Sequence, residues 1–397
     1  MRVTTCFLRW LRFWGRHLLL LNVLLFSLVW LMYGSLTLRG HGFVYADRSR
    51  DFTLLGDLSE FDLEPGIENV LLPGLASAFG VVWKAVGFEY TNTTFLVLAA
   101  VPYALFIYGL TRHLSQRSPG GRLLAVASAI VLYTSGMIPY MTSWGGYVDG
   151  LSYLLILPVV VWPESLVVYA VAFVLQCTNH YLGALAQLLV AFVWHSMKAL
   201  DQAETQESGR AVGYWLATIA PRVILSVVVL AVFMWFWENN YPEAARVRQA
   251  LAAQKWQDPQ GVLLEVLAPF PWTLLSTLKL TVIPVAALML AAHARQRLRM
   301  LILGVPFLAA GALTFVFVDI TRVATMLVLP ALLATIVAAG AGSALQPRVR
   351  RTLRRLLMGT ALLNLLIPNY YVNNGEIIVP RSEVIRLTIS RVMGAVR

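Results

Sequence analysis

The sequence predicts an all-α integral membrane protein that folds as a bundle of about 11 transmembrane helices, within a range of about nine to twelve. Of its 397 residues, 58% are hydrophobic and only 13% are charged. The hydrophobic residues form runs that approach or exceed the roughly 17 to 20 residues needed to cross a hydrocarbon core. Arginines cluster between these runs. We therefore interpret residues 1–397 as a single transmembrane domain.

Three of the predicted spans are short. Residues 150–162, 165–177 and 355–368 fall below the roughly 17 residues of a full crossing, so they are broken, paired as re-entrant segments, or extended by their neighbours. The predicted spans are 18–38, 94–111, 122–138, 150–162, 165–177, 181–198, 214–237, 272–292, 299–318, 323–341 and 355–368.

The arginine clusters predict the orientation of the chain. They precede the first predicted span and follow the second, eighth and tenth, so they share one face, which the positive-inside rule makes cytoplasmic. The N-terminus is then cytoplasmic and the C-terminus external. The preference for arginine over lysine is common in proteins from GC-rich bacterial genomes and favours a bacterial inner (plasma) membrane. The clusters contain Arg2, Arg9, Arg12, Arg16, Arg112, Arg117, Arg122, Arg295, Arg297, Arg299, Arg348, Arg350, Arg351, Arg354 and Arg355.

Three external segments follow from this topology: 39–93, 238–271 and 369–397. Within the first, residues 67–86 predict an amphipathic helix in the membrane interface. A spanning helix there is the alternative, and it would move every later basic loop to the other side. The C-terminal segment is also amphipathic and is expected to contact the membrane or a partner. The stripe of the first helix consists of Ile67, Leu71, Leu75, Phe79, Val82 and Val86.

Charge and cysteine usage exclude several classes of function. The net charge of +11 resides in short loop clusters, which favours anionic lipid headgroups over nucleic acid as the partner. Cys6 and Cys177 lie on opposite predicted sides, so no disulfide is expected, and Cys177 is interpreted as a buried thiol. No metal ligands and no cofactor are predicted, although a divalent cation is left open. No zinc-protease or rhomboid motif is present.

Polar and ionisable residues beside the apolar segments gather on the predicted external side, and charges at bilayer depth are costly, so they indicate a site. Alternatives remain for each: Asp149 as a helix cap, His180 as a structural hydrogen bonder, and Asp319 with Arg322 as an internal ion pair. Lys279 is predicted to face the same cavity. The residues on that side are Asp47, Asp51, Asp149, His180, Asp319 and Arg322.

The first external loop resembles that of the GT-C class of polytopic glycosyltransferases. The similar features are Asp47 in the stretch Ala46-Asp47-Arg48-Ser49-Arg50-Asp51, the helix at 67–86 and the pattern of spans. The resemblance implies that Asp47 is the catalytic base, with Asp51 as its rival. It also implies a polyprenyl-phosphate-linked sugar as donor, whose phosphate is held by positive residues. We assign that role to Arg48 and Arg50.

Chemistry alone extends phosphate binding to Arg322 and His180, with Asp319 orienting the arginine. The expected function is transfer of a sugar or glycan from the lipid-linked donor to a glycan or lipid acceptor at the external face. Membrane lipids and an envelope-assembly partner protein are further expected partners. The alternatives are a transporter or flippase of lipid-linked glycans and a noncatalytic subunit of a glycan assembly complex.

Overall fold

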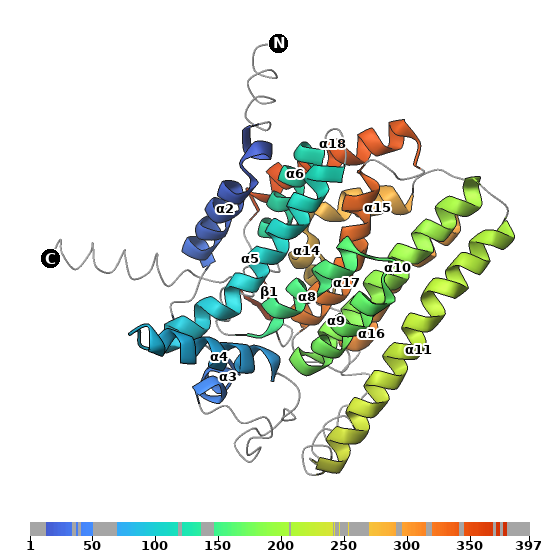
Figure 1. Cartoon of the computed structure of the whole chain (residues 1–397). Helices are drawn as coiled ribbons and strands as arrows, with labels where there is room; N and C mark the ends of the chain where they lie inside the picture. The colour runs from blue at the N-terminus through green and yellow to red at the C-terminus, as the bar shows by residue number, and fades with distance from the viewer. Residues whose placement is uncertain are drawn as a thin grey trace.

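The structure is a computed structural model in which nearly all described residues are helical (Figure 1). A short antiparallel pair of strands, β1 (Tyr371–Asn373) and β2 (Glu376–Ile378), is the exception within the described part of the chain. The structure describes residues 13–33, 37–38, 41–50, 70–117, 121–135, 147–205, 208–240, 242, 246, 253, 270–290, 296–314, 320–340, 345–367, 371–373 and 376–378.

Each of the eleven predicted spans contains a helix, and consecutive helices joined by short connections run back and forth through the bundle (Figure 1). The eighth predicted span is interrupted by a 3-10 turn, η2. The elements are α2 (Leu18–Tyr33), α5 (Asn92–Arg117), α6 (Gly121–Thr134), α8 (Asp149–Val161), α9 (Leu166–Asn179), α10 (Tyr181–Thr205), α11 (Ser208–Asn240), α14 (Phe270–Leu278), η2 (Lys279–Thr281), α15 (Val282–Met289), α16 (Gln296–Thr314), α17 (Ile320–Ala338) and α18 (Pro347–Asn364).

Four of the described helical segments are long and apolar enough to cross a membrane: Asn92–Gln116, Tyr181–Ala203, Gly209–Phe236 and Phe270–Met289. The apolar helices are therefore compatible with membrane insertion. The other predicted spans contain apolar helices of 10–17 residues or, in α18, an arginine-rich helix. The number of about 11 crossings stays a prediction.

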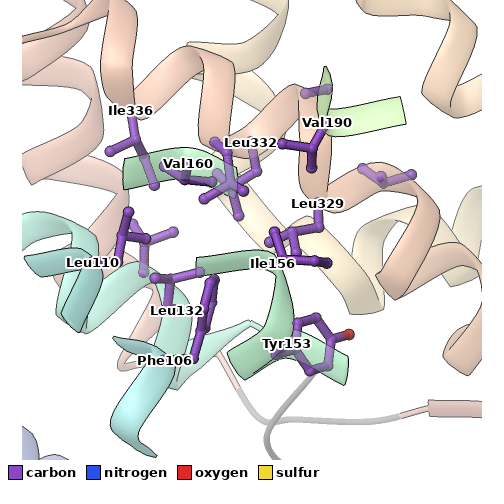
Figure 2. Packing of buried hydrophobic residues seen from close by; sticks show 14 of the residues in the cluster. Phe106, Leu110, Leu132, Tyr153, Ile156, Val160, Val190, Leu329, Leu332 and Ile336 are labelled. Carbon is purple, nitrogen blue, oxygen red and sulfur yellow. The ribbon is translucent and has the colours of Figure 1, made fainter. Parts of the chain in front are cut away.

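The centre of the bundle is α8, whose two faces are both covered. Figure 2 shows Tyr153, Ile156 and Val160 of α8 meeting side chains from α5, α6, α10 and α17. A helix that is apolar on all sides is expected to be buried in this way. Its neighbours in the figure are Phe106, Leu110, Leu132, Val190, Leu329, Leu332 and Ile336.

Two glycines bring α5 and α8 unusually close together. A Cβ added at Gly150 would overlap the carbonyl oxygen of Ala99, and one added at Gly109 would overlap Leu157. Small residues that let helix backbones approach are typical of contacts between membrane helices. Gly150 therefore permits close packing of α5 against the first turn of α8.

The outer surface of the bundle is apolar. The hydrophobic 18-residue window of α11 is only 17% buried, and Val228, Val232 and Trp235 are among its exposed side chains. In water such a surface would be a costly, contiguous apolar patch, whereas in a membrane it contacts lipid. Both the exposed apolar side of α11 and the length of this helix therefore indicate a membrane environment.

The two ends of the bundle differ in charge. At one end, which we call the arginine-rich end, Arg299 lies 3.8 Å from Asp201, and Arg354 donates to the carbonyl oxygen of Ala339. The opposite end, which we call the α3 end, carries α3 (His41–Arg50) and α4 (Leu71–Ala85) across the ends of other helices (Figure 1). The helix ends at the arginine-rich end also carry Arg16, Arg112, Arg122, Arg210, Arg348, Arg350 and Arg351.

Helix α4 corresponds to the amphipathic helix predicted over residues 67–86, of which 67–69 lie outside the described residues. Leu72 is buried, but most of the predicted apolar stripe points away from the bundle. Ala76 and Gly80 are buried, and a Cβ at Gly80 would lie 3.2 Å from the Tyr90 ring. The predicted stripe is exposed at Leu75, Phe79, Val82 and Val86. Small residues hold α4 on the protein while the stripe is free to enter lipid, although its place in the membrane interface stays a prediction.

Substituting Gly150→Val should lower the unfolding free energy by about 1 to 3 kcal/mol, because the new side chain must displace the backbone of α5. Thermal unfolding of the detergent-solubilised protein measures the effect. Gly213→Val on α11 is the control, since a Cβ added there would meet nothing within 4 Å. Equal unfolding temperatures for the two variants would contradict close packing of α5 on α8.

Candidate functional site

The α3 end contains a buried ion pair between Asp149 and Arg322. The guanidinium Nε lies 2.7 Å from one carboxylate oxygen and its second nitrogen lies 3.1 Å from the other. The side chain of Asp149 is 1% exposed and that of Arg322 is 11% exposed. A two-pronged contact of this kind is among the strongest geometries available to a carboxylate. It joins the first turn of α8 to the first turn of α17.

The helix dipoles help to explain why Asp149 and Arg322 are paired. Arg322 lies in the first turn of α17, where the helix dipole disfavours a cation, whereas Asp149 lies in the first turn of α8, where the dipole favours an anion. Asp149 does not cap its own helix, because Val148 is the N-cap residue and no side-chain cap is formed. The capping interpretation of Asp149 is therefore wrong, and the carboxylate instead neutralises a nearly buried arginine.

Aromatic contacts connect this ion pair to α3. The guanidinium carbon of Arg322 lies 5.0 Å from the centroid of the Tyr147 ring, within the range of a cation–π interaction. The ring of Tyr45, which is buried on α3, meets Tyr147 edge-on at 6.4 Å. Ser49 also bonds to the Tyr90 hydroxyl at 2.9 Å. Helix α3 is thus held directly beside the charged corner.

The other face of α3 presents Asp47 and Arg50. The Asp47 carboxylate accepts a hydrogen bond from Arg50 at 2.8 Å, and these side chains are 68% and 39% exposed. Arg50 also donates to the side-chain oxygen of Asn92, at the start of α5. Arg48 lies on the same helix and is partly buried. Asp51, the rival candidate base, lies outside the described residues.

His180 lies at the corner between α9 and α10. Its Nδ1 accepts the backbone N–H of Leu182 at 3.2 Å, and its ring stacks on Tyr181 with a centroid separation of 5.0 Å. The neighbouring Asn179 amide donates to the carbonyl of Val148 at 3.0 Å. This corner is therefore tied to the residue that precedes Asp149. The role of His180 with a phosphate or a proton stays a prediction.

Lys279 belongs to a different contact. Its ammonium donates to the carbonyls of Asn364, at 3.3 Å, and Ile367, at 2.8 Å, where α18 ends. The backbone of Lys279 has φ of 49°, and this strained residue marks the break between α14 and α15. A lysine commonly satisfies the last carbonyls of a helix. The ammonium of Lys279 therefore satisfies carbonyl oxygens at the end of α18, and its place in the site stays a prediction.

Asp319 lies outside the described residues, so its predicted pairing with Arg322 is not observed either way. Arg222, near the other end, donates to the carbonyls of Thr218 at 2.6 Å and Pro163 at 2.7 Å, so it connects α11 to the turn between α8 and α9. Cys177 is buried and is not part of a disulfide. Within the described ranges, no three His, Cys, Asp or Glu side chains are grouped so that they could hold a metal ion.

A second polar cluster, which the sequence alone did not indicate, lies at the arginine-rich end. Glu164 lies in the short turn between α8 and α9 and accepts a hydrogen bond from Lys198 at 2.5 Å. Tyr214 approaches the two oxygens of the same carboxylate at 3.2 and 3.3 Å. His195 contacts Tyr214 at 2.9 Å and the carbonyl of Pro163 at 3.0 Å. His195 and Lys198 lie three residues apart on α10, a spacing that could have indicated one shared helix face.

Comparison of the chain with protein-family models, with curated proteins and with solved structures finds no match. The function is therefore inferred from the site itself.

Removing one partner of the buried pair, by Asp149→Asn or Arg322→Gln, should cost about 3 to 5 kcal/mol because an uncompensated charge stays buried. The double variant should recover much of that loss. Unfolding free energies of the two single variants and the double variant measure the coupling. The exposed Asp47–Arg50 pair is the matched control, with an expected coupling of about 0 to 1 kcal/mol. Additive losses at Asp149 and Arg322 would contradict a direct pair.

Glu164 predicts an acid dependence of stability. Partial burial acts to raise the pKa of its carboxyl, but the hydrogen bond and charge of Lys198, together with His195 and Tyr214, lower the pKa below the ordinary 4.5. A lowered folded-state pKa stabilises the protein above pH 4.5 and loses this effect as pH falls through the folded-state pKa. The unfolding temperature should therefore fall less steeply with acid in Glu164→Gln than in the parent. Parallel curves would contradict this assignment.

Proposed function

We propose that the protein is a membrane glycosyltransferase that transfers a sugar or glycan from a polyprenyl-phosphate-linked donor to an acceptor at the α3 end of the bundle. The observation that carries the proposal is the position of Asp47. This exposed carboxylate lies on the short helix α3, which packs against α4 and α5 and also carries Arg48 and Arg50. A carboxylate at that position can act as a base without being buried in apolar surroundings.

An apolar groove beside α3 supports a lipid-linked donor. The groove lies between α2 and α5, has a volume of about 410 Å³ and is lined by apolar side chains that include Leu31 and Val101. Trp30, which also lines it, packs against the buried cluster that contains Tyr45 and Ala46 of α3. The prenyl chain lies in this groove in our proposal, so that the phosphate and sugar emerge next to α3.

The proposed reaction inverts the configuration at the anomeric carbon. The acceptor hydroxyl oxygen attacks that carbon, while the bond from the carbon to the phosphate oxygen breaks and its electron pair leaves with the polyprenyl phosphate. Asp47 takes the hydroxyl proton. Arg48 and Arg50 stabilise the charge on the departing phosphate, and a guanidinium suits phosphate oxygens because it can donate two hydrogen bonds at once. Asp51 is the alternative base.

Arg322 and His180 supply further phosphate or proton contacts in this proposal, because their corner adjoins α3. No cofactor is needed for the step as written, and a divalent cation is left open. The α3 end is proposed to face outwards from a bacterial inner membrane, with about 11 crossings, a cytoplasmic N-terminus and an external C-terminus. The acceptor is a glycan or a lipid, and an envelope-assembly protein is a proposed partner.

Transport of a lipid-linked glycan is the second candidate function. It is favoured by the break at η2, since interrupted helices with buried charges are common in transporters. Lys279 is buried at that break. Gln176 and Gln187 are also fully buried within the bundle. These groups suit a path through the bundle better than a reaction at its end. A noncatalytic role in a glycan assembly complex is the third candidate.

The purified protein in lipid vesicles should transfer radiolabelled sugar from a panel of polyprenyl-phosphate donors. Asp47→Asn should reduce transfer at least about 100-fold, the scale of losing general-base catalysis, without weakening donor binding. Glu89→Gln is the control, because Glu89 is another exposed carboxylate just before α5.

Transfer that survives Asp47→Asn but not Asp51→Asn would move the base to Asp51. Transfer that survives both substitutions would remove the first-loop carboxylates from the mechanism. A parent protein that transfers no sugar from any donor, but moves a labelled lipid-linked glycan across the vesicle membrane, would favour the transporter.

A further inference from the structure

A cavity of about 660 Å³ opens at the arginine-rich end, far along the bundle from α3. Its walls come from the turn between α8 and α9, from α10 and from the last turns of α17. One wall is apolar and includes Val337 and Ala338, and the rim carries Glu164, Lys198 and Asp201. This division into an apolar wall and a charged rim matches an amphiphile better than a wholly polar or wholly apolar ligand.

The rim places opposite charges side by side. The ammonium of Lys198 lies 2.5 Å from a Glu164 oxygen, and these side chains are 43% and 50% exposed, so both can reach a ligand. Asp201, one helical turn after Lys198 on α10, is 26% exposed and lies 3.8 Å from the buried Arg299. A headgroup that carries a phosphate and an amine complements this rim. A headgroup with only negative charge would bring its phosphate next to two carboxylates.

The turn that carries Glu164 is held in place before any ligand binds. The carbonyl oxygen of Pro163 lies 2.7 Å from an Arg222 nitrogen and 3.0 Å from His195 Nε2. Ser165 begins α9 by accepting the backbone N–H of Val168 at 3.2 Å. A site with fixed walls loses less conformational entropy on binding than one that must be ordered.

Trp162 gives a further indication that the cavity opens where membrane meets water. It lines the cavity and is 59% exposed. An indole ring is favoured at that level because it is apolar with one polar edge. The charged rim then lies at the level of the lipid headgroups.

We propose that this cavity binds one zwitterionic aminophospholipid of the phosphatidylethanolamine type. Its phosphate contacts Lys198, its ammonium contacts Glu164 and Asp201, and the first part of an acyl chain lies against Val337 and Ala338. The site is at the opposite end from the proposed transfer reaction and does not depend on it.

Native mass spectrometry of the full-length protein tests this proposal. The protein would be released from detergent micelles after titration with phosphatidylethanolamine, phosphatidylcholine or phosphatidylglycerol. One phosphatidylethanolamine should remain bound, in preference to the other two lipids, because a primary ammonium can donate hydrogen bonds that a quaternary one cannot. Lys198→Met and Glu164→Gln should each weaken binding about tenfold, as expected for losing one hydrogen bond to a charged group.

Lys84→Met is the matched control, because Lys84 lies on α4 at the other end of the protein and should leave binding unchanged. Val337→Trp tests the apolar wall without altering the rim, and it should exclude the lipid while the protein still unfolds cooperatively. Equal retention of phosphatidylglycerol, retention that no cavity variant changes, or no retained lipid would each overturn the proposal.

Discussion

The contact between Asp149 and Arg322 is the constraint on which the arrangement of the α3 end depends. Arg322 is nearly buried at a helix N-terminus, where the helix dipole adds to the cost of a cation, so a carboxylate must lie close to it. Asp149 supplies this carboxylate. The next residue, Gly150, allows the first turn of α8 to pack closely against α5. Tyr147 then covers the guanidinium and receives Tyr45. These ring contacts connect the ion pair to α3, the helix that carries Asp47.

Local patterns in the sequence predict most of the helices, because the length and spacing of apolar residues in a segment indicate a helix without reference to the rest of the chain. Helix α4 is an example: its stripe was visible from spacing alone. Helix α3 could have been predicted in the same way, since its buried residues Gly42, Tyr45, Ala46 and Ser49 follow helical spacing. Charged residues dominate the segment, however, and they favour a loop.

The pairing of charges could not be predicted locally. Arg322 has Asp319 three residues away in sequence, yet its observed partner is 173 residues away. Lys279 likewise bonds to carbonyls 85 and 88 residues away. Such pairs depend on which helices become neighbours. Glu164 and Lys198 were missed for the same reason, because neither residue is unusual until α8, α9 and α10 pack together.

The most direct test of the account is to find where a lipid-linked donor sits. A polyprenyl phosphate with a photoreactive group near the phosphate end of its chain would be crosslinked to the protein in vesicles, and the modified peptides would be identified by mass spectrometry. If the donor binds in the groove between α2 and α5, labelling should occur around Trp30, Leu31 and Val101. Unlabelled polyprenyl phosphate should compete with this labelling. Competed labelling confined to the cavity at the arginine-rich end, or no competed labelling, would contradict a donor site beside α3.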